Sequence, residues 1–155
     1  MKYEIERKFL VHKDKWSKAE KPEGKIIRQG YILTDPRKTM RIRVISDNAF
    51  LTIKGLTNGI KRPEYEYEIP LNDANDLLDE FSESEITKIR YDIFYDNKKW
   101  EVDEFHGDNE GLMFAEIELI SEDEIFSTPD WIGKEVTGDE RYYNSNLSVN
   151  PFKNW

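Results

Sequence analysis

The chain has 155 residues, no cysteine and a formal net charge of −9. This length suits a single domain over residues 1–155, and the lack of cysteine excludes disulfide bonds and thiolate metal sites. The negative charge argues against nucleic acid or an anionic membrane as a partner, and no apolar run is long enough for a transmembrane helix. The first residues, MKYEIERKFLV, contain no apolar signal-peptide segment, so we expect a soluble, cytoplasmic protein.

Apolar and charged residues alternate along most of the chain, and this period of two predicts β-strands. The expected strands are residues 3–11, 26–34, 39–46, 49–55, 63–70, 86–96, 99–106 and 112–120. Short turn segments after the third and the sixth of these strands predict hairpins. Short helices are expected at residues 13–19, 72–81 and 139–147, and the middle one places Leu77, Leu78 and Phe81 on one face.

The order of these elements predicts the fold class. Eight strands in mostly antiparallel order, with a few flanking helices, indicate an α+β protein that is mainly β. A sheet of this kind is expected to close into a barrel or to curl strongly. We therefore predict an eight-stranded antiparallel β-barrel, or tunnel.

Charged side chains occupy one face of nearly every expected strand. Residues two apart on a strand share a face, so EIERK at residues 4–8 places Glu4, Glu6 and Lys8 together. Apolar residues fill the opposite faces, as Ile42 and Val44 do in RIRV. The other charged or polar faces carry Arg41 and Arg43, Thr52 and Lys54, Glu64, Glu66 and Glu68, Lys88 and Arg90, Glu101 and Asp103, and Glu116 and Glu118.

A sheet with one solvated face would explain any single one of these strands. It explains the whole set less well, because the charges come in pairs and triplets of the same sign, and like charges on one face repel. We therefore expect the charged faces to line a shared lumen, where a bound ligand offsets the repulsion.

The two signs of charge suggest what that ligand is. Arginine and lysine bind phosphate oxygens, and carboxylates bind hard divalent cations such as Mg²⁺ or Mn²⁺. A phosphate chain with its metal ions would neutralise both groups. The basic candidates are Lys8, Arg41, Arg43, Lys54, Lys88 and Arg90. The acidic candidates are Glu4, Glu6, Glu64, Glu66, Asp103, Glu116 and Glu118.

These motifs resemble those of a known family. EIERK is similar to the Glu-x-Glu-x-Lys signature of the CYTH domain, part of the triphosphate tunnel metalloenzyme superfamily. The resemblance continues in order through RIRV, TIKG, EYEYEI, KIRY, VDEF and AEIEL to WIGKEVTGDERYYNSNL, over roughly residues 3–147. The resemblance implies a tunnel of eight antiparallel strands that binds a triphosphate and a divalent metal ion. It also implies an activity, since short bacterial members of the family are most often inorganic triphosphatases.

The resemblance also implies roles for single residues. Glu4, Glu6 and Glu118 match the usual metal ligands of the family, with Glu116 and Asp103 beside them. The six basic candidates match its phosphate-binding residues. Glu64 and Glu66 match acidic positions that hold a second metal or orient the attacking water, and the choice among residues 64, 66 and 68 stays open.

The expected reaction is attack of water on the terminal phosphoanhydride, in line with the leaving group. Lys54 would stabilise the charge on the phosphate oxygens, and a carboxylate such as Glu66 would activate the water. Tyr31, in RQGYIL, would carry a proton if it points inward near Lys54; the alternative is that it only packs.

Several other functions stay open at this point. Class IV adenylate cyclase and thiamine triphosphatase belong to the same superfamily, and a non-catalytic polyphosphate-binding module would use the same basic residues. A structural β-domain is the remaining alternative. The apolar outer face of such a barrel is large, so we also expect a homodimer.

Overall fold

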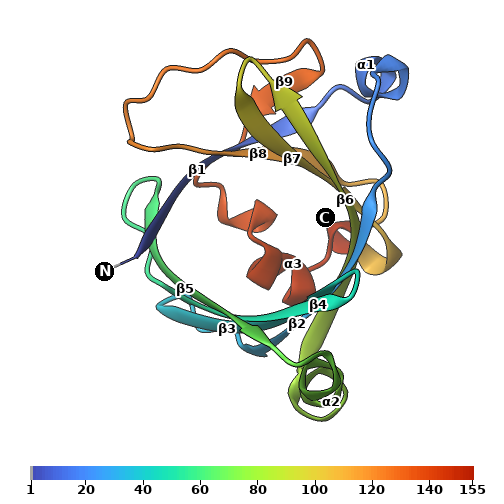
Figure 1. Ribbon diagram of the computed structural model, residues 1–155, viewed down its shortest axis with the longest axis vertical. Helices are drawn as coiled ribbons and strands as arrows, with labels where there is room; N and C mark the ends of the chain where they lie inside the picture. Colours follow the sequence, from blue (N-terminus) through green and yellow to red (C-terminus); the bar gives the residue numbers. More distant parts are fainter. Residues whose placement is uncertain (1) are drawn as a thin grey trace.

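The computed structural model describes residues 2–155, and a closed antiparallel β-barrel forms its centre (Figure 1). The strands follow one another around the barrel in the order β5-β4-β3-β2-β6-β7-β8-β1, and β5 pairs with β1 to close it. This arrangement confirms the predicted eight-stranded barrel. Its strands are β1 (Tyr3–Val11), β2 (Lys25–Leu33), β3 (Lys38–Ile45), β4 (Asn48–Gly55), β5 (Lys61–Ile69), β6 (Ser84–Tyr95), β7 (Lys98–Phe105) and β8 (Met113–Glu118).

The closing strand, β1, divides one of its edges between two partners. Its residues 3–5 pair with β5, and Phe9 and Val11 pair with a ninth strand, β9 (Ile132–Glu135). The sequence did not predict β9, because four residues are too few to show a period of two. Its Gly133 lies close to β1, where an added Cβ would be 3.1 Å from the carbonyl oxygen of Leu10.

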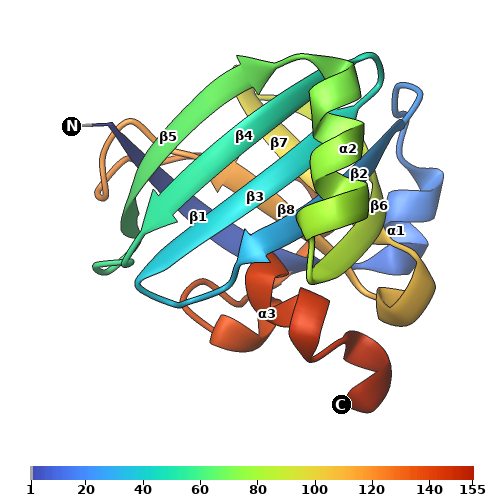
Figure 2. The ribbon, with the colours of Figure 1, turned by 90° about the horizontal axis from the view of Figure 1, so that it is seen from below.

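The helices lie outside the barrel wall or across its end. Helix α2 (Leu71–Phe81) packs on the outer side of β2, β3 and β4 (Figure 2). Its buried residues are Ala74 and Leu78, one helical turn apart, whereas Phe81 is 58% exposed. Of the three residues expected to share one face, Leu78 is buried and Leu77 packs against the same cluster, whereas Phe81 is left largely in solvent. The remaining helical elements are α1 (Lys13–Lys18), η1 (Gly107–Asn109), η2 (Glu140–Tyr142), α3 (Asn144–Val149) and η3 (Phe152–Asn154).

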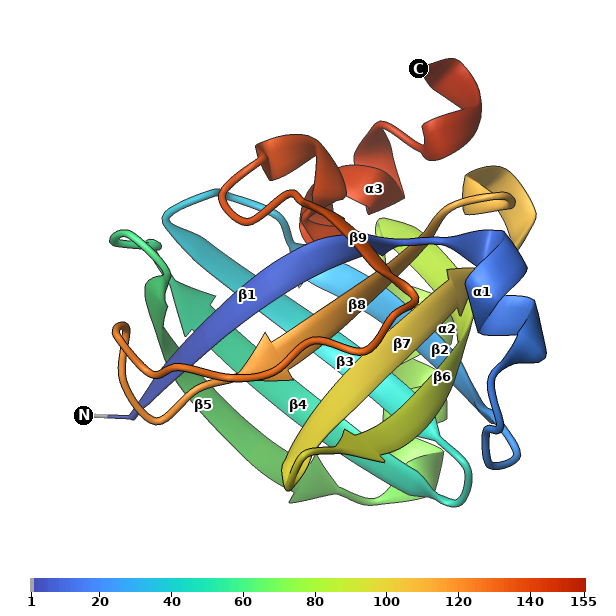
Figure 3. The same ribbon diagram turned by 90° about the horizontal axis from the view of Figure 1, so that it is seen from above.

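The helix expected at residues 139–147 is divided in two. Tyr143 has an extended backbone, with ψ at 131°, and separates η2 from α3. This segment lies in the opening of the barrel in Figure 1 and at one end of it in Figure 3. We call residues 136–147 the C-terminal plug. Its buried apolar side chains pack with Phe105 and Phe114 of the barrel; they are Val136, Tyr142 and Leu147.

The largest apolar cluster lies on the outer side of the barrel wall, around β1, β7 and β8. Phe9 and Trp100 meet edge to face at 5.7 Å between ring centroids, and Trp16 and Trp131 meet at 5.0 Å. Trp16, Trp100 and Trp131 thus cover the outside of the barrel wall, whereas Trp155 is 42% exposed beside the plug. Because apolar residues cover the wall outside, the inward faces are left to the charged side chains. Within residues 2–155, no helix is both long enough and apolar enough to cross a bilayer.

Gly30 marks the close contact between β2 and α2. An added Cβ would lie 2.6 Å from Leu78 Cδ2 and 2.8 Å from Ser82 Cβ. We expect Gly30→Ala to lower the free energy of unfolding by about 1–3 kcal/mol, because the helix must move outward. Urea denaturation measures this loss. Gly55→Ala, whose Cβ would come no closer than 3.2 Å to Pro63, should lose less; equal losses would contradict the proposed clash.

Candidate functional site

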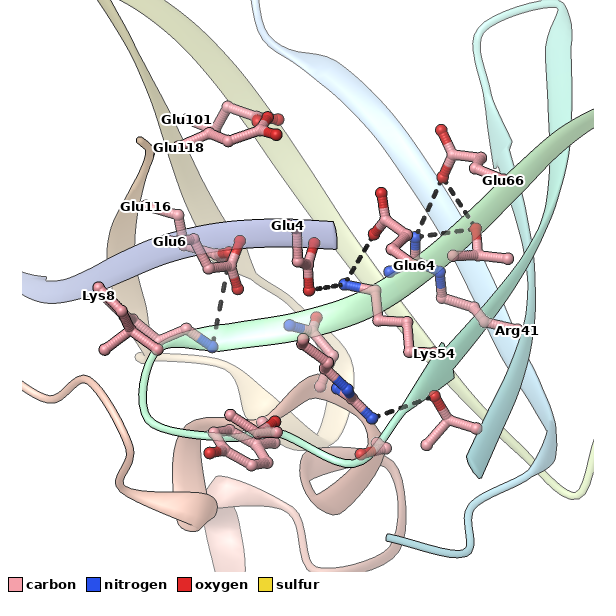
Figure 4. Close-up of a pocket in the computed structure, with 18 of the residues that line it drawn as sticks. Glu4, Glu6, Lys8, Arg41, Lys54, Glu64, Glu66, Glu101, Glu116 and Glu118 are labelled. Carbon is pink, nitrogen blue, oxygen red and sulfur yellow. Dashed lines mark hydrogen bonds and ion pairs between the residues drawn. The ribbon is translucent and has the colours of Figure 1, made fainter. Parts of the chain in front are cut away.

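The barrel encloses a cavity of about 310 Å³, lined by the charged faces of its strands (Figure 4). The cross-strand register brings these faces together: Glu6 lies opposite Glu118, and Lys8 lies opposite Glu116. All but one of the predicted site residues line this cavity. They are Glu4, Glu6, Lys8, Tyr31, Arg41, Arg43, Lys54, Glu64, Glu66, Lys88, Arg90, Glu116 and Glu118.

Lys54 lies between two carboxylates at the closure of the barrel. Its Nζ is 2.7 Å from Glu4 Oε1 and 3.2 Å from Glu64 Oε2, so one cation links β4 with β1 and β5. Burial opposes the charge of both partners, but the attraction is larger: Glu4 and Glu6 raise the pKa of Lys54, and Lys54 lowers the pKa of Glu4. Lys54 is therefore held as a cation inside the cavity.

Two arginines of β3 point toward the same carboxylate. Arg41 Nη2 lies 3.6 Å and Arg43 Nη2 lies 3.3 Å from Glu66 Oε2, and Thr52 Oγ1 donates to that oxygen at 2.8 Å. Burial, together with the positive charges of Arg41 and Arg90, lowers the pKa of Arg43 to about 10. A guanidinium in such surroundings gains from any further anion, and phosphate oxygens fit the paired N–H groups of arginine.

Asp103 is the predicted site residue that does not line the cavity. Its side chain is 0% exposed and receives hydrogen bonds from Lys88 Nζ at 2.7 Å and from Arg90 Nε and Nη2 at 2.7 and 2.8 Å. Burial opposes ionisation, yet these two cations hold the pKa of Asp103 far below its usual range. Both carboxylate oxygens accept from these cations, so Asp103 holds Lys88 and Arg90 in place, and its metal role stays a prediction that this geometry argues against.

Lys8 lies where the barrel meets the C-terminal plug. Its Nζ donates to the Tyr142 carbonyl oxygen at 2.9 Å, lies 3.9 Å from Glu116 Oε1, and is 4.4 Å from the centre of the Phe114 ring. Burial opposes the charge of Glu116, but Lys8 lowers its pKa to about 2. Glu116 is therefore ionised at neutral pH.

Three carboxyl groups of the cavity have raised pKa values, so their ionised forms are less favourable than in water. Burial and the neighbouring Glu116 and Glu4 raise the pKa of Glu6 well above its usual value. Burial and a hydrogen bond with Glu4 raise the pKa of Glu64 to about 7. Burial, Glu4 and Glu101 also raise the pKa of Glu118. The acidic side of the cavity thus holds more carboxyl groups than its lysines and arginines stabilise as anions.

This excess of carboxylate oxygens fits a hard divalent cation, since Mg²⁺ and Mn²⁺ prefer such ligands. Within residues 2–155, however, no three acidic or histidine side chains already stand in a metal-binding arrangement. Glu4 and Glu64 instead contact Lys54. The donor chemistry fits a metal, and the carboxylates would have to turn from lysine toward it.

Comparison with known proteins agrees with this geometry. Residues 2–148 match the model of the protein family described as CYTH domain. The chain belongs to the CYTH family. A CYTH-like relative from Acetivibrio thermocellus, named inorganic triphosphatase, is 52% identical over 153 residues, which cover 98% of this chain and 97% of the relative. The resemblance predicted from the sequence motifs is therefore confirmed.

Two further relatives support the same grouping. A protein from Nitrosomonas europaea, also named inorganic triphosphatase, is 36% identical and is matched over 94% of this chain and 97% of its own length. A crystal structure of an inorganic triphosphatase, 33% identical, superimposes with a TM-score of 0.64 over 94% of this chain and 97% of that one. The barrel is thus shared along nearly the whole length of these proteins.

The CYTH barrel also brings residues into the cavity that the sequence analysis did not select. Arg62 lies two residues before Glu64 on the same face of β5, and its Nε donates to the Gly55 carbonyl oxygen at 2.7 Å. The alternation in KRPEYEYE includes Arg62, but the expected strand began at residue 63, one residue too late to contain it. Asn144 enters from the C-terminal plug, and no strand period could have placed it there.

Proposed function

We propose that this protein is an inorganic triphosphatase, a divalent-metal-dependent hydrolase that cleaves the terminal phosphoanhydride of tripolyphosphate. The observation that carries the proposal is the convergence of the six predicted lysines and arginines with the six predicted glutamates on one cavity. The set comprises Lys8, Arg41, Arg43, Lys54, Lys88 and Arg90 with Glu4, Glu6, Glu64, Glu66, Glu116 and Glu118. The names of the relatives from Acetivibrio thermocellus and Nitrosomonas europaea support the same substrate.

In this proposal the six cations bind the phosphate chain. Arginine side chains donate paired N–H groups to phosphate oxygens, and the lysines act as point charges between them. Arg90 is oriented by Asp103 before substrate arrives, and Lys54 by Glu4 and Glu64. Catalysis then comes from positioning and from neutralising charge on the phosphate oxygens.

Glu4, Glu6, Glu64, Glu116 and Glu118 would hold Mg²⁺ or Mn²⁺. When bound, such an ion neutralises phosphate charge and orients the chain for attack. Glu66 is proposed to orient the attacking water: its contacts with Arg41, Arg43 and Thr52 all reach Oε2, so Oε1 stays available for a water molecule.

Tyr31 is proposed to carry a proton during the reaction. Its ring lies on the inward face of β2, opposite Arg41 on β3, and its hydroxyl oxygen accepts from Gln29 Nε2 at 3.3 Å. We expect Tyr31→Phe to lower kcat about 100-fold with little change in KM, because the ring stays and only the proton carrier is lost. Steady-state phosphate release measures both constants. Full activity of Tyr31→Phe at alkaline pH would leave Tyr31 with a packing role only.

The raised pKa values of Glu6, Glu64 and Glu118 lead to a prediction about metal and pH. Between the ordinary value of 4.5 and about 7, Glu64 keeps its proton in the folded state but loses it in the unfolded state. Without metal, the free energy of unfolding should therefore fall as pH rises through this window. A bound divalent ion needs these carboxylates deprotonated, so Mg²⁺ binding should release protons at pH 7.

Calorimetry in two buffers of different ionisation enthalpy measures that proton release, and thermal unfolding from pH 5 to 8 measures the slope. In Glu64→Gln, both the slope and the proton release should decrease. Glu135→Gln is the control, since Glu135 lies outside the cavity in an ion pair with Arg7. A wild type that binds Mg²⁺ equally well at pH 5.5 and pH 8 would contradict this account.

The composition of the cavity wall favours tripolyphosphate over organic triphosphates. Among the described residues, the aromatic side chains that line it are Tyr31 and Tyr143. Tyr143 belongs to the C-terminal plug, and the other described lining residues offer no further ring for stacking on adenine or thiamine. This observation argues against adenylate cyclase and thiamine triphosphatase.

The deciding experiment is a phosphate-release panel. Tripolyphosphate, ATP, thiamine triphosphate and pyrophosphate are each tested with Mg²⁺, Mn²⁺ and Ca²⁺. We expect tripolyphosphate to have the highest kcat/KM by a wide margin. Cyclic AMP formed from Mn²⁺-ATP would instead make the protein a cyclase, and tight binding of tripolyphosphate without turnover would make it a polyphosphate-binding module.

We also propose that the protein is a homodimer and is located in the cytoplasm. Support for a dimer comes from apolar side chains on the outer face of β1, β4 and β5, where Tyr3, Ile53 and Tyr67 are exposed. Sedimentation that shows a monomer at micromolar concentration would count against it.

A further inference from the structure

Two amide side chains meet at the plugged end of the cavity and have no role in the chemistry proposed above. Gln29 lies on the inward face of β2 and is 0% exposed. Asn144 is the first residue of α3 and lines the cavity from the C-terminal plug. Gln29 Nε2 donates to Asn144 Oδ1 at 3.2 Å, so the pair links the barrel wall to the plug.

Each member of this pair also contacts a residue of the proposed site. Lys88 Nζ donates to Asn144 Oδ1 at 2.9 Å and to Asp103 Oδ2 at 2.7 Å. An ammonium has three N–H groups, so one remains for a phosphate oxygen. Gln29 Nε2 lies 3.3 Å from the Tyr31 hydroxyl oxygen. Because that oxygen accepts from the amide, its own hydrogen is left to donate elsewhere.

We propose that Asn144 is a positioning residue, whose amide oxygen fixes the ammonium group of Lys88 and, through Gln29, the hydroxyl group of Tyr31. The proposal rests on the triphosphatase function proposed above. Lys88 is 1% exposed, and its two oxygen partners restrict where the remaining N–H can point. A cation restricted in this way needs no reorganisation when phosphate arrives.

The plug can hold this position because it is anchored on two sides. The Val136 backbone N–H donates to the Lys8 carbonyl oxygen at 2.8 Å, which ties the start of the plug to β1. Leu147, at its end, is fully buried against Phe105 and Phe114, and its carbonyl oxygen accepts from Asn109 Nδ2 at 3.4 Å. The Asn144 side chain therefore stands on a fixed segment of the fold.

The test replaces Asn144 by leucine, which has nearly the same shape and no hydrogen-bonding group. We expect Asn144→Leu to raise KM for tripolyphosphate and to lower kcat, with kcat/KM falling about 10- to 100-fold. Calorimetry without metal should show weaker binding of tripolyphosphate as well. A purely structural role would reduce the fraction of folded enzyme but leave KM and this affinity unchanged, and that result would overturn the proposal.

A second variant tests the link through Gln29. Gln29→Met keeps the length of the side chain and removes the amide. If Gln29 and Asn144 act through one hydrogen bond, the double variant should lose less kcat/KM than the product of the two single losses. Losses that simply multiply would show that Asn144 does not act on Tyr31 through Gln29, which would overturn that half of the proposal.

Asn146→Leu is the matched control. It has the same residue type on the same helix, but its Nδ2 donates to the Glu140 carbonyl oxygen at 2.7 Å and it does not line the cavity. We expect wild-type KM, kcat and affinity for it. If the wild type binds tripolyphosphate without hydrolysing it, the proposed enzyme function is wrong. The affinities of the wild type and Asn144→Leu, measured by calorimetry, then decide whether Asn144 positions Lys88. A wild type that does not bind tripolyphosphate overturns both proposals.

Discussion

Lys54→Met is expected to lower kcat/KM for tripolyphosphate about 100- to 1000-fold, the usual loss when one preorganised charge-stabilising group is removed. Lys54 is buried as a cation between Glu4 and Glu64, at the point where three strands meet. Its removal takes positive charge from the phosphate chain and leaves two carboxylates facing the substrate. Steady-state phosphate release with Mg²⁺ or Mn²⁺ measures the loss.

Folding of the variant is checked by thermal unfolding, since Glu4 and Glu64 can take up protons once Lys54 is gone. Lys98→Met is the matched control. Lys98 also forms an ion pair, at 2.6 Å from Glu124, but neither residue lines the cavity. Its kcat/KM should stay at the wild-type value. If Lys54→Met kept more than a tenth of the activity, Lys54 would not stabilise charge in the reaction.

Asp103→Asn should produce the largest loss of stability, about 3–5 kcal/mol in the free energy of unfolding. The substitution leaves Lys88 and Arg90 buried without the carboxylate that receives three of their hydrogen bonds. In the wild type, this stabilisation is present above the ordinary pKa of 3.8 and is lost only as pH falls toward the lowered value. Urea denaturation at pH 7 measures the difference.

The control for Asp103→Asn is Asp108→Asn, which breaks an exposed ion pair of similar length, 2.8 Å from Lys153. An exposed pair contributes about 0–1 kcal/mol, so this variant should unfold close to the wild type. The double variant Asp103→Asn/Lys88→Met should recover part of the loss, because one of the two buried cations that lose Asp103 as a partner is removed. Equal effects of the two single variants would show that Asp103 does not hold a buried charge network.

Much of the fold and of the site could be predicted from the sequence because one period governs both. The alternation in RIRV and KIRY fixes which side chains share a face, and a closed barrel turns one face inward. The repulsion between like charges on one strand is weaker in the folded barrel, however, than the sequence alone suggests. Cross-strand neighbours of opposite sign, such as Lys54 and Glu64, offset part of the repulsion that the sequence places along each strand.

The period of two gives the face of a residue but not its depth in the barrel. Glu101 and Asp103 share a face, yet Glu101 lines the cavity while Asp103 lies opposite Phe114, near the apolar residues beneath the plug. The prediction that Asp103 lines the cavity with the other carboxylates fails for this reason. Nor could the sequence show β9 or the plug, because their positions depend on packing against residues more than a hundred positions away.

The division of the β1 edge between β5 and β9 has a consequence for how the protein is made. Residues 3–11 are synthesised before every strand with which they pair, and their neighbours in β8 and β9 follow only at residues 113–118 and 132–135. Strand β1 must therefore wait, unpaired along most of its length, until β8 and β9 have been synthesised. Chains that stop before residue 113 would lack the strand that joins β1 to β7, so the charged cavity could not form although most of its lining residues are already present.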